Sequence, residues 1–194
     1  MAHPEQFNFV ASVKEHYPSY FFNSKVLEIG SLNLNGTIRT LFDNCDYLGI
    51  DVAEGRGVDK VAFGNEFDAP DNTYDVCISC ECFEHNPYWK ETFINMHRMC
   101  KLGGLVIVTC ATTGRAEHGT LRANPQDSPI TSRMGWTYYK NLTEKDFLET
   151  FKLENMFKHF YLHENKNLHF QNDLFFLGIK WEWSGETARQ SSGF

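Results

Sequence analysis

The chain has 194 residues, of which 42% are hydrophobic and 22% charged, and this is the balance of a single globular domain with a buried core. Its formal net charge of −7 disfavours DNA and other polyanions as partners. No apolar run approaches the length of a membrane span, and six Cys residues without a secretory signal predict reduced thiols in the cytoplasm.

The first predicted elements alternate between helix and strand. Residues 4–17 carry apolar side chains at helical spacing and predict a helix, which belongs to an N-terminal cover of residues 1–24. Strands are predicted at residues 25–30 and 47–51, with a short helix over residues 36–44 between them. A strand, a glycine-bearing turn, a helix and a second strand form the opening unit of a nucleoside-binding α/β sheet.

The turn after the first strand is expected to face this nucleoside. Gly30 allows the backbone to approach a ligand closely, and the helix after Gly36 is expected to offer free N–H groups that favour a carboxylate. Asp51, at the end of the second strand, can accept hydrogen bonds from ribose hydroxyls. The turn lacks the G-x-G-x-x-G pattern, which counts against NAD or FAD and leaves a dehydrogenase as the weaker alternative.

The remaining elements continue the α/β pattern. Strands are predicted at residues 58–63, 74–79 and 105–110, and a helix at residues 87–101. A further helix follows Asn141, with Thr143 and Asp146 in the positions of a capping box, and two strands lie between residues 153 and 183. The whole is expected to be one domain of residues 1–183 with a flexible tail of residues 184–194.

One long segment, residues 111–141, has no helical or strand period and is rich in Gly, Pro, Thr and Ser. Loops of this length in a compact domain are commonly lids or binding loops. The segment leaves the carboxyl end of the fifth strand, which is the edge where open α/β sheets bind ligands. We therefore expect it to face the substrate.

Cysteine and histidine gather after the fourth strand. Cys77, Cys80, Cys82 and His85 stand close together in the sequence, but their spacing is unlike that of structural zinc sites and no second matched pair exists. No metal site is predicted. Core thiols next to a polar loop are the preferred interpretation.

Five short motifs follow one another in a defined order. They are Val26-Leu27-Glu28-Ile29-Gly30, Gly49-Ile50-Asp51-Val52, Tyr74-Asp75-Val76-Cys77-Ile78-Ser79, Cys82-Phe83-Glu84-His85 and Leu102-Gly103-Gly104-Leu105-Val106-Ile107-Val108-Thr109. This set resembles the class I S-adenosylmethionine-dependent methyltransferases (type 11-like) and, with the closing strand pair, covers residues 25–183. The resemblance implies a Rossmann-like, doubly wound α/β sheet of seven strands, mostly parallel with the last strand antiparallel, and helices on both faces.

The same resemblance implies S-adenosylmethionine as the cofactor and S-adenosylhomocysteine as the product. The residues expected around the cofactor are Glu28, Gly30 and Ser31 at the methionine part, Asp51 with Val52 at the ribose, Phe63, Gly64 and Asn65 near the adenine, and Cys80 with His85 beside the sulfonium or the substrate. Two departures stand out. Leu32 replaces the second glycine of the first motif, and Phe63 stands where many relatives carry an acid.

The leading candidates for a catalytic base are His85 and His118, because imidazole accepts a proton near neutral pH, and Glu84 is the weaker candidate. Arg115, His118, Trp136 and Tyr139 are the predicted substrate-binding residues, since they combine charge with aromatic surface in the long loop. Each of these predictions has a structural alternative. His85 can instead cap the following helix, His118 can belong to a solvated loop, and Trp136 and Tyr139 can pack the loop onto the core.

The function predicted from the sequence is methyl transfer by in-line displacement to a small-molecule acceptor, with a sugar or saccharide-linked intermediate as the leading guess. One alternative is a methyltransferase that acts on protein or RNA with a partner chain. The other is a non-catalytic protein that uses the same fold to bind or scaffold.

Overall fold

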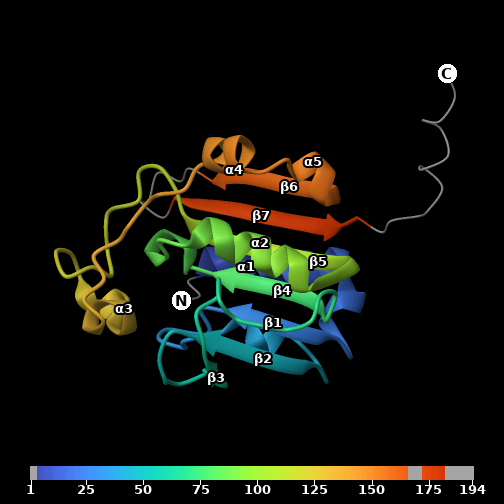
Figure 1. The fold of residues 1–194 in the computed structure, drawn as a ribbon, viewed down its shortest axis with the longest axis horizontal. Helices are drawn as coiled ribbons and strands as arrows, with labels where there is room; N and C mark the ends of the chain where they lie inside the picture. Colours follow the sequence, from blue (N-terminus) through green and yellow to red (C-terminus); the bar gives the residue numbers. More distant parts are fainter. Residues whose placement is uncertain (1–3, 166–171, 182–194) are drawn as a thin grey trace, which may run out of the picture.

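The computed structural model describes residues 4–165 and 172–181, and its strands form one sheet in the order β3-β2-β1-β4-β5-β7-β6 (Figure 1). Strands β1 to β5 are parallel, and β7 lies antiparallel between β5 and β6. This confirms the predicted sheet. The strands are β1 (Lys25–Ile29), β2 (Asp46–Asp51), β3 (Lys60–Val61), β4 (Tyr74–Cys80), β5 (Cys100–Ala111), β6 (Phe157–Asn165) and β7 (Asp173–Lys180).

Helices cover both faces of this sheet. The α-helices are α1 (Pro4–His16), α2 (Trp89–Met99), α3 (Pro129–Arg133), α4 (Glu144–Thr150) and α5 (Leu153–Met156). Single 3-10 turns occur at Pro18–Phe21 (η1), Ile38–Leu41 (η2), Phe83–His85 (η3) and Pro125–Asp127 (η4).

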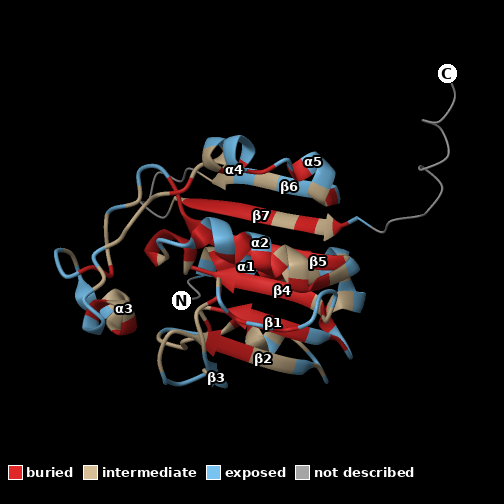
Figure 2. Ribbon diagram, viewed as in Figure 1, coloured by how far each residue is buried: buried red, intermediate tan, exposed pale blue. Residues whose placement is uncertain are grey.

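The central strands are buried on both sides, as the red ribbon in Figure 2 shows. Successive side chains of a strand point to opposite faces, so Val26 and Ile78 pack on the face covered by α1, whereas Leu27 and Cys77 pack on the face covered by α2. Because both faces are covered, the strands read as continuous apolar runs. The sheet edge at the strand ends is therefore the place where polar side chains can gather.

The predicted helix over residues 36–44 is wrong. Only one 3-10 turn forms, Ile38–Leu41, and the chain becomes extended at Phe42. The cause is tertiary: the Asp43 N–H donates to the Phe21 carbonyl at 2.8 Å, and Phe42 stacks on Phe21. A segment this short gains too few helical hydrogen bonds to resist such contacts. The helix that was expected to offer free N–H groups after Gly36 is therefore reduced to this one turn, in which the Arg39 N–H donates to the Thr37 hydroxyl at 3.1 Å.

The long segment after β5 leaves the sheet and returns to the same point. The Thr112 N–H donates to the Asn172 carbonyl at 3.0 Å, and the Leu142 N–H donates to the Ala111 carbonyl at 2.9 Å. Between these stems the chain forms η4 and α3, which Figure 1 shows standing beyond the carboxyl ends of the parallel strands. We call residues 112–141 the covering loop.

The tail predicted for residues 184–194 lies outside the described residues. Among the helices that the structure describes, none combines the length and the apolar character that crossing a bilayer requires.

Replacing Thr143 with Ala is expected to lower the free energy of unfolding by about 1 kcal/mol. The capping box forms as predicted, because the Thr143 hydroxyl accepts from the Asp146 N–H at 3.1 Å while the Asp146 carboxylate accepts from the Thr143 N–H at 3.0 Å. Urea denaturation measures the change. Thr150→Ala, an exposed substitution at the end of the same helix, is the matched control. Equal unfolding midpoints for the two variants would contradict a stabilising cap.

Candidate functional site

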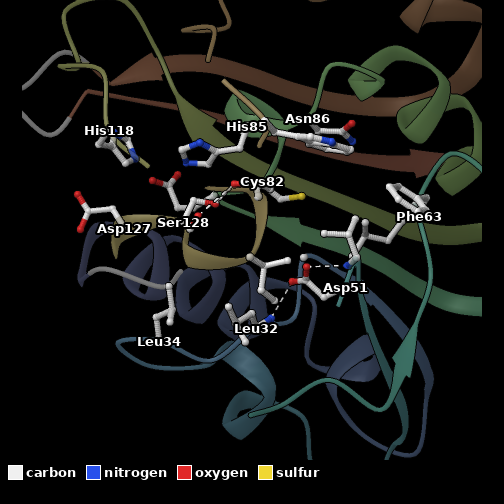
Figure 3. Close-up of a pocket in the computed structure, with 18 of the residues that line it drawn as sticks. Leu32, Leu34, Asp51, Phe63, Cys82, His85, Asn86, His118, Asp127 and Ser128 are labelled. Atoms are coloured by element: carbon white, nitrogen blue, oxygen red, sulfur yellow. Dashed lines mark hydrogen bonds between the residues drawn. The ribbon is translucent and has the colours of Figure 1, made fainter. Parts of the chain in front are cut away.

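A cavity of about 420 Å³ opens at the carboxyl ends of β1, β2 and β4, beneath the covering loop (Figure 3). This volume lies in the usual range for small-molecule sites. It contains most of the residues predicted for the site. Of these, Gly30, Asp51, Val52, Phe63, Gly64, Asn65, His85, Arg115, His118 and Trp136 line the cavity.

The floor of the cavity depends on a close approach between β1 and the turn after β4. Gly30 has a φ of +80°, and a Cβ atom at this position would lie 2.6 Å from the Cβ of Cys82. Any side chain there would collide with Cys82 and would also strain the backbone. Gly30 thus opens the space in which a ligand can reach the backbone.

The turn after Gly30 accommodates Leu32 in place of the second glycine because of the loop that follows β2. A Cβ atom on Gly55 would meet the Leu32 side chain at 2.2 Å, so Gly55 makes room for Leu32. The Asn33 N–H also donates to the Arg56 carbonyl at 2.8 Å. The loop after β2 therefore holds the turn after Gly30 in place, and this explains how the motif accommodates Leu32 instead of a second glycine.

The Asp51 carboxylate connects the ends of β1 and β2 at the cavity wall. Its Oδ2 accepts from the Leu32 N–H at 3.1 Å and its Oδ1 accepts from the Val52 N–H at 2.7 Å (Figure 3). Burial raises the pKa of Asp51 above its ordinary value, and the two N–H donors oppose this rise. Each oxygen retains a further lone pair toward the cavity for a hydroxyl donor.

Glu28, Ser31 and Cys80 do not line the main cavity. They line a second, much smaller one next to Gly30. Glu28 is buried and accepts from the Tyr47 hydroxyl at 2.9 Å. Burial raises the pKa of Glu28 from 4.5 to about 7. The Ser31 hydroxyl is also buried, with no partner among the described residues.

Aromatic side chains form the wall opposite this floor. The ring centroids of Phe63 and of Trp136 in the covering loop are 5.9 Å apart, and those of Tyr88 and Trp136 are 6.4 Å apart. The covering loop thus contacts the segment after β3. Gly64 is required at its position because a Cβ atom there would lie 2.7 Å from the Ile29 side chain.

Three rings form a cluster at the other end of the cavity. His85 lies 5.0 Å from His118 and 5.5 Å from Tyr139 between ring centroids, and His118 lies 5.1 Å from Tyr139. Burial lowers the pKa of His85 from 6.5 to about 4, so its imidazole is neutral at pH 7. Tyr139 does not line the cavity but supports both histidines. The sequence placed His85 and His118 33 residues apart, and the fold brings them together.

Arg115 has a structural partner on each side. Its Nη1 donates to Asp173 at 2.7 Å and its Nη2 donates to Glu81 at 3.3 Å. Asp173 is fully buried and Glu81 nearly so, and Glu81 also holds a left-handed φ of 51°. Arg115 therefore fastens the covering loop to β7 and to the end of β4, in addition to lining the cavity.

Sequence reasoning missed several cavity residues. Cys82 and Asn86 lie in the turn after β4 and were not predicted as site residues, while Asp127 and Ser128 come from the part of the covering loop without a helical or strand period. Glu81 precedes the motif and has no sequence signal of its own. Its partner Arg115 is 34 residues away in the sequence, and only the fold reveals the pair.

Comparison with known proteins agrees with this architecture. The family model described as methyltransferase domain matches residues 38–108. No match was found among curated proteins.

Solved structures similar to the chain share its fold at low identity. Two structures of phosphoethanolamine N-methyltransferase 2 from Haemonchus contortus, one of them in complex with S-adenosylhomocysteine, align with TM-scores of 0.63 and 0.64 at 16% identity. The alignments cover 90% of this chain and 52% of those chains. The chain thus spans about half the length of these proteins. A Burkholderia thailandensis 1,6-didemethyltoxoflavin-N1-methyltransferase aligns with a TM-score of 0.59 at 12% identity, covering 94% and 92%.

The cyclase SpnF aligns as well, with a TM-score of 0.63 at 12% identity, covering 91% of this chain and 81% of its own. The fold that these proteins share is therefore compatible with more than one chemistry, so the function of this chain has to be inferred from its site. The sheet order and the matched domain confirm the resemblance of this chain to the class I S-adenosylmethionine-dependent methyltransferases.

Replacing Arg115 with Met is expected to lower the free energy of unfolding by about 3 kcal/mol, because the buried carboxylates of Glu81 and Asp173 would both lose the guanidinium that pairs with them. Chemical denaturation measures this. Arg122→Met removes an exposed pair with Glu117 in the same loop and is expected to change the free energy of unfolding far less, because solvent screens an exposed ion pair. Similar losses in both variants would show that Arg115 does not fasten the loop.

The free energy of unfolding of the ligand-free protein is expected to contain a term from Glu28 that falls as the pH rises from 4.5 to about 7. In this window the folded state keeps a proton on Glu28 that the unfolded chain has released, so raising the pH favours unfolding, by about 3 kcal/mol in total. Glu28→Gln should remove this term. The measurement is urea denaturation of both proteins at several pH values, and parallel profiles would contradict the raised pKa.

Proposed function

We propose that the protein transfers the methyl group of S-adenosylmethionine to a small-molecule acceptor bound beneath the covering loop. The observation that carries this proposal is the single cavity that joins Gly30 and Asp51 at one end to His85 and His118 at the other. A site for the cofactor nucleoside thereby opens directly into a site for an acceptor. The resemblance to methyltransferases solved with S-adenosylhomocysteine supports the assignment.

The residues at the first end fit this cofactor. Gly30 provides a cradle that any Cβ atom would fill, and the buried Ser31 hydroxyl offers an unused hydrogen-bonding group beside it. We assign the ribose hydroxyls to Asp51 and the adenine ring to the wall of Phe63, Gly64 and Asn65. The methionine part is assigned to the main cavity beside Gly30, next to the hollow of about 10 Å³ that Glu28, Ser31 and Cys80 line, which has room for about one water molecule.

The residues at the second end suit a polar acceptor. Trp136 presents an aromatic face of the kind that stacks on a sugar ring, and Arg115, His118 and Asp127 provide polar groups around it. A sugar or a saccharide-linked intermediate therefore remains the leading acceptor. The covering loop favours a small molecule over a protein or RNA, because it folds back over the cavity.

When bound, the cofactor supplies a methyl group that the positive sulfur has already activated for in-line displacement. The contribution of the protein is to position the acceptor in line and to exclude water. The covering loop shields the cavity, and Arg115 holds that loop down. His85 and His118 act on the acceptor from the far wall, where a hydroxyl nucleophile has to lose its proton. The six free thiols are in keeping with a cytoplasmic enzyme.

Asp51→Asn is expected to weaken the binding of S-adenosylhomocysteine by at least about tenfold, since a hydrogen bond to a charged acceptor contributes roughly 1.5–3 kcal/mol. The introduced NH₂ group would also face the Leu32 or Val52 N–H donor. Isothermal titration calorimetry measures the affinity.

Asp46→Asn is the matched control, because Asp46 is the exposed acid at the other end of the same strand. Its affinity should equal that of the unaltered protein. If the unaltered protein does not bind S-adenosylhomocysteine at millimolar concentration, both enzymatic interpretations fail and a scaffold function takes their place.

A further inference from the structure

We propose that Glu84, His85 and His118 hold a divalent transition-metal ion at the acceptor end of the cavity. Each of these residues offers one ligand atom, and the three atoms lie within 4.8 Å of one another. Two of the residues belong to the 3-10 turn after β4, and the third belongs to the covering loop. The sequence pattern did not predict this site, because the spacing of Glu84 and His85 to His118 resembles no common metal motif.

The first argument is the burial of polar groups that have no protein partner. Glu84 is fully buried; its Oε1 accepts from the Ala111 N–H at 3.3 Å, whereas its Oε2 has no partner among the described residues. The His85 Nδ1 is buried and equally without a described partner. Leaving such groups unsatisfied is costly, and a cation that both atoms bind would satisfy them at once.

The second argument is the orientation of His118. Its Nδ1 lies 3.0 Å from the Ala116 carbonyl oxygen. A carbonyl can only accept, so Nδ1 carries the proton and the Nε2 lone pair remains available. This arrangement of one ring nitrogen on a backbone carbonyl and the other free is the usual support for a metal-ligating histidine.

The backbone after His118 is shaped to bring the two rings together. Gly119 has a φ of +63°, and a Cβ atom there would lie 2.7 Å from the His85 ring. Only glycine lets the covering loop turn so tightly against His85. Tyr139, whose hydroxyl donates to the Ala116 carbonyl at 3.2 Å, packs against both imidazoles and fixes them.

The donor set indicates the kind of ion. Two imidazoles and one carboxylate suit Zn²⁺, Fe²⁺ or Co²⁺ better than Ca²⁺ or Mg²⁺, which prefer oxygen ligands. In a tetrahedral site with bonds of roughly 2.1 Å, ligand atoms lie about 3.4 Å apart, so the atoms of the cluster have to approach one another by up to about 1.4 Å. Both His85 and His118 line the cavity, which leaves the remaining coordination positions toward the acceptor.

The consequence for catalysis rests on the proposed function. An ion at this wall would lower the pKa of an acceptor hydroxyl that coordinates it and would fix the direction of that oxygen. The two histidines would then serve as ligands that act on the acceptor through the ion. Metal binding itself does not depend on methyl transfer.

The test is a titration of the chelator-treated full chain, with Co²⁺ followed by visible absorption and Zn²⁺ followed by calorimetry. We expect one ion per chain and a Co²⁺ spectrum typical of nitrogen and oxygen ligands. Glu84→Gln and His118→Ala should each weaken binding by at least about tenfold. His16→Ala, an exposed histidine at the end of α1, should leave binding unchanged, and circular dichroism verifies the fold of each variant.

The proposal is overturned if the unaltered chain binds no stoichiometric ion at millimolar Zn²⁺, or if folded Glu84→Gln and His118→Ala variants bind as tightly as the unaltered chain. Calorimetry with S-adenosylhomocysteine on the metal-free chain separates this outcome from failure of the proposed function. Cofactor binding without metal binding refutes only the metal site. Metal binding without cofactor binding supports the metal site and refutes the proposed function.

Discussion

The close contact of Gly30 with Cys82 is the constraint on which the cavity depends. Two parallel strands end side by side at this point, and no side chain fits between Gly30 and the turn after β4. The missing side chain leaves a hollow at the sheet edge, where Asp51 provides the neighbouring wall. The sheet tolerates this hollow because apolar side chains are fully packed on both of its faces below it.

A second constraint closes the cavity from above. The covering loop contributes little apolar packing of its own, so its position depends on a few strong polar contacts. Arg115 provides the central one, since it pairs with two buried acids, Asp173 in β7 and Glu81 just after β4. Asn141 adds a hydrogen bond of 2.8 Å to the Arg115 carbonyl. Rigid attachment at the loop stems lets the loop residues meet the turn after β4 in one fixed arrangement.

The parts of the fold that the sequence predicted are those determined locally. Short apolar runs identified β1, β2, β4 and β5, and the pair Thr143 and Asp146 identified the start of α4, because both signals arise within a few residues. The helix over residues 36–44 failed for the opposite reason, since Phe42 and Asp43 are held by contacts with Phe21.

The residues of the site also divide into those that a local sequence pattern predicts and those that only the fold brings together. Gly30 and Asp51 were recognisable because their spacing follows the sheet, and both line the cavity. The accommodation of Leu32 by Gly55, and the pairing of Arg115 with Asp173, join residues 23 and 58 positions apart. Such contacts depend on how loops meet in space, and no local pattern encodes them. Sequence reasoning alone therefore predicted the cavity residues at the ends of β1 and β2 better than the contacts that hold the loops around them.

The central claim is that this cavity binds the nucleoside of S-adenosylmethionine across β1 and β2 with its sulfur directed toward the acceptor end. A crystal structure of the protein with S-adenosylhomocysteine tests it most directly. The account predicts ribose hydroxyls within hydrogen-bonding distance of the Asp51 carboxylate and a sulfur atom beside Cys82 and His85. Cofactor bound elsewhere on the molecule, or a cavity that stays empty at saturating S-adenosylhomocysteine, would contradict it.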